Sequence, residues 1–310
     1  MAITMDQTPE QQAVNCLRLG ELDRANYLAK QEIIADQGGA RRLWLCRFVR
    51  ADVLRIRGGP EPALAYLDSL PVPEAEDAAS CSSFKLRRGH CMGLLGRHQP
   101  CQRLLDEAQT IAFKANASES LAEVHLSRAF IHYLRQDYAA ADSEYHAVLK
   151  LSEQIPGWYF RGYGMWGIGK VLMIREAHKE AIPQLNESLR VFEDVGAKLP
   201  IAMVWSELAV CYLGLGDDVQ ALELLQKAER VDYEAGAIHN YQVSLANIGN
   251  VYLYRRDYFT AICYYRRALE YSRQLKDPVS IKKWTFNITL AYARIREAID
   301  TRSMSAWPAC

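Results

Sequence analysis

Residues 162–171 read GYGMWGIGKV and fit two phosphate-binding patterns at once. Gly162, Gly164 and Gly167 spell G-x-G-x-x-G, and the overlapping G-x-x-x-x-G-K pattern ends at Gly169 and Lys170. Both patterns bind phosphate only where a strand leads into a glycine loop that opens a helix, because backbone N–H groups then point at the anion. The chemistry of this stretch therefore depends on the elements that surround it.

Other residues that could carry catalysis form no recognisable constellation. The seven histidines are scattered, and the sequence contains no G-x-S-x-G, no H-E-x-x-H and no cysteine–histidine signature of a known nucleophile family. Paired carboxylates such as Asp217 and Asp218 fall at expected turns, where solvation is the simplest interpretation. We therefore expect no catalytic residues and no enzyme activity, with a nucleotide-binding enzyme that uses residues 162–170 as the alternative.

A metal site is not expected either. The eight cysteines include no C-x-x-C pair, although Cys81, Cys91 and Cys101 recur at ten-residue intervals with His90 and His98 among them. Zinc binding there competes with packing, because free cysteine behaves as a small buried apolar residue. We favour packing and expect no metal and no cofactor.

The charge balance excludes a strong bulk field. Lysines and arginines number 37, as do aspartates and glutamates, so the formal net charge is zero. Nothing in this balance attracts nucleic acid or an anionic membrane, and we expect no membrane partner and a cytoplasmic protein. A local basic run is interleaved with Trp44 and Phe48, and either contacts an acidic partner or covers apolar surface with arginine stems, which we favour. Its members are Arg41, Arg42, Arg47, Arg50, Arg55 and Arg57.

Small residues recur at a fixed interval along the chain. Anchor positions lie 40 residues apart from residue 101 to residue 261, and 38 apart before that; they are Ala25, Ala63, Cys101, Ala141, Ala181, Ala221 and Ala261. Twelve residues before the later anchors is another small residue, and four after each is a large apolar or aromatic one. A period of this length predicts stacked supersecondary units.

Each unit has the pattern of two antiparallel helices joined by a polar turn. Apolar residues recur at three- and four-residue spacing, as in Leu222, Leu225 and Ala228, and prolines separate the units. No unit buries its apolar face alone, so stacking must supply the core. We expect an all-α solenoid over residues 1–300, with about seven units and a capping helix at 281–299, followed by a tail at 301–310.

This frame resembles the tetratricopeptide repeat. Gly249, Tyr252, Ala261, Tyr265 and Ala268 match places 8, 11, 20, 24 and 27 of its consensus, and the resemblance covers roughly residues 10 to 300. The units here are about 40 residues long rather than 34, and place 15 drifts from glycine to Gln136, Glu176 and Arg256. The resemblance implies a right-handed superhelix of helix pairs, in which Gly169 is a packing residue and residues 162–167 lie on or just before the same helix. The four glycines predict a soft point in the array.

The resemblance also implies a binding surface. First helices line the concave face in this family, and their exposed places contact peptide ligands. The corresponding positions predict a groove lined by Tyr163, Trp166, Lys170, Asn247, Asn250, Tyr254, Lys283, Asn287 and Arg294. Asn247 and Asn250 followed by Lys283 partly resemble the clamp that some members use for a terminal carboxylate, although place 5 is Ala246 rather than lysine.

We therefore expect a scaffold or adaptor that binds a peptide or protein partner on its concave face. The units are also similar to the repeat halves of bacterial proteins that carry a caspase-like (CHAT) peptidase domain, which is absent here, so the expected partner is a separately encoded effector. Trp284, Phe286, Ile288 and Leu290 give the last helix an apolar side through which the chain could form a homodimer.

Overall fold

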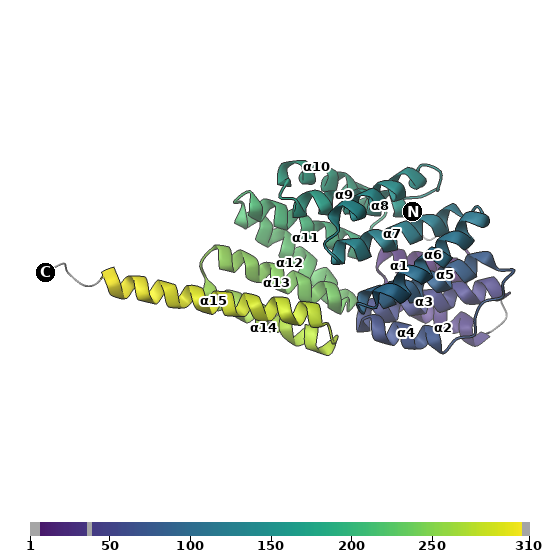
Figure 1. Ribbon diagram of the computed structural model, residues 1–310, viewed down its shortest axis with the longest axis horizontal. Coiled ribbons are helices and arrows are strands. Elements are labelled where there is room, and N and C mark those ends of the chain that lie inside the picture. The colour runs from purple at the N-terminus through teal and green to yellow at the C-terminus, as the bar shows by residue number, and fades with distance from the viewer. Residues whose placement is uncertain (1–6, 36–38, 306–310) are drawn as a thin grey trace.

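The computed structural model describes residues 7–35 and 39–305, and every regular element in these ranges is an α-helix (Figure 1). The helices form seven antiparallel pairs and a long last helix. The first pairs are α1 (Pro9–Leu19), α2 (Leu22–Ala35), α3 (Ala40–Gly58), α4 (Pro60–Asp68), α5 (Ala78–Leu94), α6 (His98–Lys114), α7 (Ser118–Leu134) and α8 (Tyr138–Ser152). They continue with α9 (Tyr159–Ile174), α10 (His178–Glu193), α11 (Lys198–Gly214), α12 (Asp218–Ala235), α13 (Ile238–Tyr254), α14 (Tyr258–Gln274) and α15 (Pro278–Ser305). The expected all-α solenoid of stacked helix pairs is confirmed.

The repeating anchors form the contact between paired helices. All seven lie in the second helix of a pair, and each is at most 2% exposed. In the later pairs the small residue of the first helix meets the second helix close to the anchor; Gly249, for example, packs on Tyr265 four residues after Ala261. Small side chains on both helices let the backbones approach, and the large neighbours fill the remaining volume.

The turns between paired helices keep one geometry although their sequence varies. Gly216 has φ +88°, and Gln136, Glu176 and Arg256 adopt φ between +60° and +62° at the same place. In each turn the following residue donates its backbone N–H to the carbonyl five residues earlier, as Asp217 does to Tyr212 at 2.9 Å, which closes the helix end as a Schellman motif. Replacing glycine therefore leaves the turn intact and introduces local backbone strain.

The glycine stretch lies inside a helix. Residues 162–170 belong to α9, which lies between α8 and α10, so the strand and loop that both phosphate patterns require are absent here. On the α8 side, a Cβ at Gly164 would lie 3.2 Å from the Leu149 backbone, and one at Gly167 would overlap the Tyr145 ring. On the other side, Gly162 and Gly169 receive Phe192 and Leu185 of α10. The glycines thus serve close packing on two faces.

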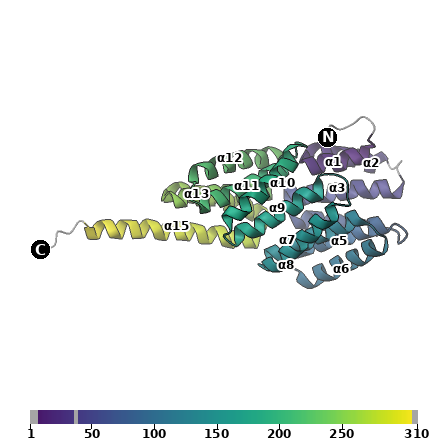
Figure 2. The same ribbon diagram turned by 90° about the horizontal axis from the view of Figure 1, so that it is seen from above.

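The superhelix turns far enough for its first helices to contact later ones. Helix α1 touches α11, and α3 touches α13, as the neighbouring purple and green ribbons of Figures 1 and 2 show. Leu199 at the start of α11 packs against Gly20, and Arg57 donates to the carbonyl of Ala235 at 3.5 Å. These contacts join the two ends of the array into one body.

Helix α15 is longer than predicted. It runs from Pro278 to Ser305, whereas the sequence indicated an end near Ile299 and a non-helical tail from residue 301. No proline interrupts the chain between Pro278 and Pro308, so nothing stops the helix earlier. The C-terminal part of α15 projects beyond the stack (Figure 1). None of the described helices is both long and apolar enough to cross a membrane.

We predict that the strained turns can be relaxed by glycine. Glu176→Gly and Arg256→Gly should each raise the free energy of unfolding by about 0.5–1 kcal/mol, because glycine reaches positive φ without a Cβ clash. Gly216→Ala should lower it by about 1 kcal/mol. Urea denaturation followed by circular dichroism measures all three. A loss of stability in both glycine variants would show that these turns are not strained.

We also predict that α9 cannot accept a methyl group at Gly167. Gly167→Ala should lower the free energy of unfolding by about 1–3 kcal/mol, because overlap with Tyr145 outweighs the roughly 1 kcal/mol that alanine gains in helix propensity. Gly58→Ala is the control, since its added Cβ would meet only the Pro62 ring at 3.3 Å. Tyr145→Leu should recover part of the loss when combined with Gly167→Ala, and equal stability of Gly167→Ala and wild type would refute the packing role.

Candidate partner-binding surface

The first helices of the later pairs, together with α3 and α15, present side chains to a shared interior that we call the inner face. The surroundings of His239 on α13 show the character of this face. Burial lowers the pKa of His239, Asp277 opposes this, and the positive charges of Arg55 on α3 and Lys170 on α9 lower the pKa further. The His239 side chain is nevertheless 49% exposed. A group that protein surrounds and water still reaches lies in a concave surface rather than in the core.

Lys170 is held inside this face by its neighbours. Its ammonium lies 2.9 Å from Glu207 of α11 and over the rings of Tyr133 and Trp166, at 4.4 and 4.7 Å from their centroids. Burial would lower the pKa of Lys170, but the Glu207 carboxylate and nearby phenol groups raise it above its usual value. Lys170 and Glu207 are only 13% and 14% exposed. Lys170 therefore connects α7, α9 and α11 and already has an anionic partner.

The predicted asparagines come together where α13, α14 and α15 meet. Asn250 accepts from the Tyr265 hydroxyl at 2.7 Å, its amide faces Asn247 Oδ1 at 3.4 Å, and Asn287 donates to Asn250 Oδ1 at 3.5 Å. These bonds connect three helices through amide groups that keep further donors and acceptors. The asparagines thus form one polar cluster on the inner face.

Lys283 lies one helical turn before Asn287. Its ammonium lies 4.9 Å from the centroid of the Trp284 ring, and no carboxylate among the described residues pairs with it. Burial lowers the pKa of Lys283, Lys170 lowers it further, and Glu207 opposes them. Lys170, Glu207 and Lys283 therefore share one electrostatic environment across α9, α11 and α15.

Four predicted residues have other positions. Trp166 is buried against Tyr145 and the Lys170 ammonium lies over its ring, so it supports Lys170 instead of presenting a binding surface. Tyr163 is partly buried in an aromatic cluster. Tyr254 is exposed at the end of α13 beside the turn at residue 216, and Arg294 pairs with Glu297 at 2.9 Å on α15.

A second polar cluster was not predicted. Arg87 of α5 donates to Asp52 of α3 at 3.0 Å and lies 3.6 Å from Glu123 of α7, while Arg55 lies 3.6 Å from Asp52. Burial would raise the pKa of Asp52, but Arg87 and Arg55 hold it below its usual value. Burial and the same arginines lower the pKa of His90 to about 3, which keeps that ring neutral. The spacing from 52 to 87 to 123 approximates the repeat period and could have indicated the cluster.

The basic run is engaged within the protein. Arg42 pairs with Glu10 and Arg57 with Asp23, while Arg47 and Arg50 cover the rings of Trp44 and Tyr66. This agrees with arginine stems covering apolar surface. Among the described residues no group of three His, Cys, Asp or Glu side chains could hold a metal ion, and Cys91 and Cys101 are buried.

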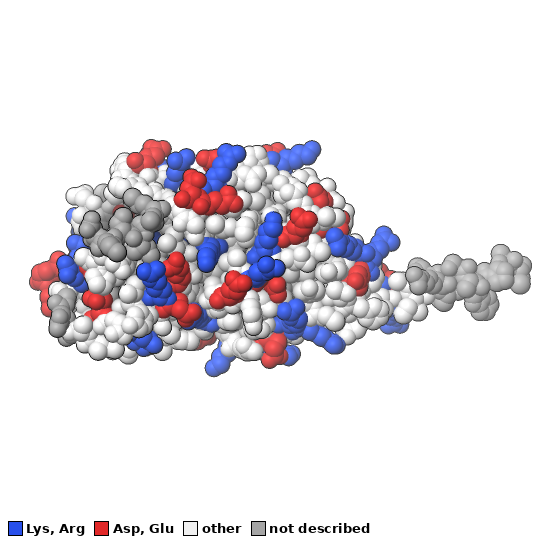
Figure 3. All heavy atoms as spheres, turned by 180° about the vertical axis from the view of Figure 1, so that it is seen from behind, with Lys and Arg blue, Asp and Glu red and all other residues white. Residues whose placement is uncertain are grey.

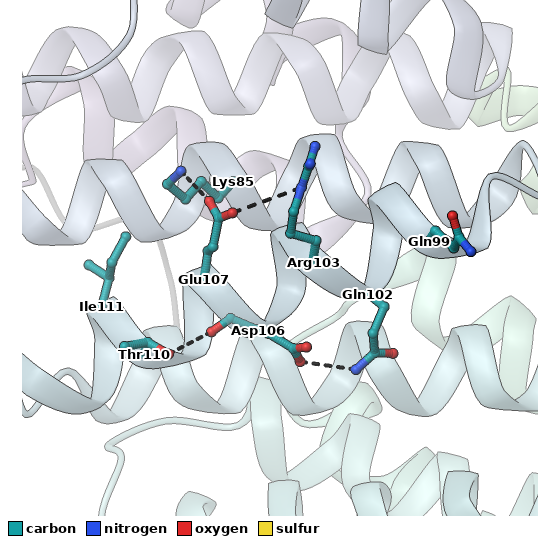
Figure 4. Close-up of a pocket in the computed structure, with 8 residues that line it drawn as sticks. All are labelled: Lys85, Gln99, Gln102, Arg103, Asp106, Glu107, Thr110 and Ile111. Atoms are coloured by element: carbon teal, nitrogen blue, oxygen red, sulfur yellow. Dashed lines mark hydrogen bonds and ion pairs between the residues drawn. The ribbon is translucent and has the colours of Figure 1, made fainter.

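A depression of about 670 Å³ lies outside the inner face, along α5 and α6 (Figure 4). Its polar groups satisfy one another: Lys85 pairs with Glu107 at 2.6 Å, and Gln102 donates to Asp106 at 3.0 Å. Because these groups already have partners, the depression offers little to a ligand.

Comparison with known proteins agrees with this architecture. Residues 160–234, which span α9 to α12, match the tetratricopeptide repeat family. These four helices are tetratricopeptide repeats. The frame of small and large residues in these four helices continues in the pairs on either side.

Solved structures with this fold come from several proteins. A Rap protein in complex with Competence and Sporulation Factor has a TM-score of 0.68 at 15% identity, covering 93% of this chain and 85% of that chain. A signal transduction ATPase with a tetratricopeptide repeat sensor from Pyrococcus horikoshii has 0.59 at 14%, covering 95% and 49%. Aspartyl phosphate phosphatase F from Bacillus subtilis has 0.54 at 12%, covering 98% and 86%. At these identities the likeness concerns the fold.

We predict that the pair of Lys170 and Glu207 is needed for stability. Glu207→Gln should lower the free energy of unfolding by about 3 kcal/mol, because it leaves a buried ammonium without its carboxylate. Lys170→Met/Glu207→Leu should recover most of that loss. The exposed pair of Arg190 and Glu187 is the control, and Glu187→Gln should change stability by less than about 0.5 kcal/mol in the same denaturation assay. Equal effects at the two sites would contradict the structural role.

Proposed function

We propose that this protein is a regulatory or sensor scaffold that binds a peptide or protein segment on the inner face between α9 and α15. The observation that carries the proposal is Lys283, an exposed ammonium that lies beside the asparagine cluster and has no carboxylate partner among the described residues. A positive charge without an anionic neighbour in the protein can form a charge-assisted hydrogen bond with an anionic group of a partner.

The chemistry of the cluster favours a carboxylate on the bound segment. Lys283 supplies the charge, and the amides of Asn287 and Asn250 can donate hydrogen bonds to the same group. Lys170 adds positive potential, although its own ion pair with Glu207 keeps it in place. The segment's terminal carboxylate or an acidic side chain fits this arrangement equally well.

The rigid support of the cluster also favours binding. Tyr265 of α14 holds Asn250, and Asn287 of α15 bonds to the same oxygen, so the donors are oriented before a ligand arrives. Preorganised groups lose less side-chain freedom on association. The role proposed here needs no chemistry from the protein itself. We propose that the protein acts in the cytoplasm and that its partner is a separately encoded effector. The Rap protein bound to Competence and Sporulation Factor is a precedent within the same fold.

We predict that crosslinking will locate the partner on this face. A photoreactive amino acid at position 287 should crosslink one specific protein in lysate of the source organism, and Lys283→Ala in the same chain should abolish the adduct because the anionic group loses its charge partner. The same photoreactive residue at exposed position 190 on α10 is the control. Mass spectrometry identifies the adducts.

Two results would contradict the proposal. Identical adducts from positions 287 and 190 would show that capture does not depend on the inner face. An adduct at 287 that persists in both Lys283→Ala and Asn250→Ala would show that a partner passes nearby without using the polar cluster.

A further inference from the structure

The C-terminal end of the array differs in charge from the rest. Residues 255–302 contain eleven lysines or arginines and five acidic residues, a net charge of +6, whereas the remaining residues carry −6. Some of this charge is neutralised on α12, where Asp218 pairs with Arg255 and Glu229 with Arg267 at 3.6 Å. Lys and Arg side chains also gather beside the end from which α15 leaves the stack in Figure 3. The remaining excess of positive charge therefore lies mainly on α14 and α15.

Part of this charge lies on what we call the terminal face, the side of α14 and α15 that points away from the earlier pairs. One helical stripe of α14 contains Phe259, Arg266 and Arg273, while α15 contributes Lys282 and Phe286 one turn apart and Tyr292 further along the helix. A hydrogen bond of 2.8 Å from Arg266 to the Tyr292 hydroxyl joins the two helices on this side. All six side chains are exposed.

The shape of this face fits a helix. In each of the seven pairs a second helix packs along the first, whereas no described residue covers α15 in that way. The exposed rings are large, since Phe259 is 72%, Phe286 65% and Tyr292 46% exposed. Apolar rings spaced along two adjacent helices match the stripe that an amphipathic helix buries.

The charge of this face selects an acidic helix. Arg266, Arg273 and Lys282 border the aromatic side chains, so acidic residues beside the apolar stripe of a docked helix would meet them. Nucleic acid fits less well, because Glu270 lies between Arg266 and Arg273 on the same stripe and would repel phosphate groups. We propose that the terminal face binds an acidic amphipathic helix of a partner protein, separately from the inner face.

The test uses a designed fluorescent peptide of about twenty residues, with leucines at i, i+3, i+4 and i+7 and glutamates beside them. Fluorescence anisotropy should show binding to the full chain that weakens at least about tenfold in Arg266→Glu/Arg273→Glu and falls as salt rises. Arg103→Glu/Arg190→Glu, which reverses two exposed charges elsewhere, should bind like wild type. A peptide with lysines in place of glutamates should bind at least about tenfold more weakly.

Cys263 provides a reporter of position. It lies on the α14 stripe between Phe259 and Arg266 and is the one exposed cysteine among the described residues. The acidic peptide should slow maleimide modification of Cys263 several-fold and leave Cys81 unchanged, as mass spectrometry of the labelled fragments will show.

Three results would overturn the proposal. Equal binding of the acidic peptide to wild type and Arg266→Glu/Arg273→Glu, or of the glutamate and lysine peptides to wild type, would remove the charge argument. A single-stranded oligonucleotide that binds more tightly than the acidic peptide and protects Cys263 would assign the face to nucleic acid. A dimer seen by sedimentation, lost in Arg266→Glu/Arg273→Glu and accompanied by no peptide binding, would assign it to a second copy of this chain.

Discussion

The approach of helix α9 to its neighbours on both sides determines how the array is built. Gly164 and Gly167 admit Leu149 and Tyr145 of α8, and Gly162 and Gly169 admit side chains of α10, so neither contact leaves room for a Cβ. This packing brings Lys170 within reach of Tyr133 in the preceding pair and Glu207 in the following one. A looser α9 would separate these groups and with them the middle of the inner face. The glycines that resemble a phosphate loop thus serve close helix packing, because they have no side chain.

The array is stabilised differently on its two sides. Between paired helices the contacts are apolar and repeat with the anchors, which makes each pair much like the next. Across the inner face the links are ionic and individual, since Asp52, Arg87 and Glu123 join three pairs while Lys170 and Glu207 join two others. Buried ion pairs contribute little net stability compared with apolar packing, but they fix which neighbours lie side by side. The apolar contacts therefore make the solenoid, and the ionic contacts distinguish its positions.

The sequence predicted those parts of the structure that depend on local repetition. Small anchors at 38- and 40-residue spacing require helix pairs, because no other arrangement buries them so regularly, and the positions of Asn247, Asn250 and Asn287 follow from the same frame. The predictions were less accurate where side-chain reach decides the outcome. Trp166 occupies an exposed place in the repeat frame, yet its side chain is buried and the Lys170 ammonium lies over its ring.

The contact of α1 and α3 with α11 and α13 was beyond prediction for another reason. It depends on the rotation between successive pairs, and small rotations accumulate over several units. No local sequence pattern determines the total rotation along the array.

Helix α15 belongs to both proposed surfaces, and this links them physically. Lys283 and Asn287 lie on its inner side, whereas Lys282, Phe286 and Tyr292 lie on its terminal face. Along most of its length α15 packs on only one other helix, α14, through Trp284 and Ala291, so it has fewer restraints than a helix inside the array. A helix bound on the terminal face would restrict α15 further, and Lys283 and Asn287 would then depart less often from the arrangement that the hydrogen bonds of Asn250 already favour. Because such coupling is reciprocal, a segment bound on the inner face would strengthen binding at the terminal face by the same factor. A scaffold with one shared helix can in this way make its two partners depend on each other without any change in the rest of the fold.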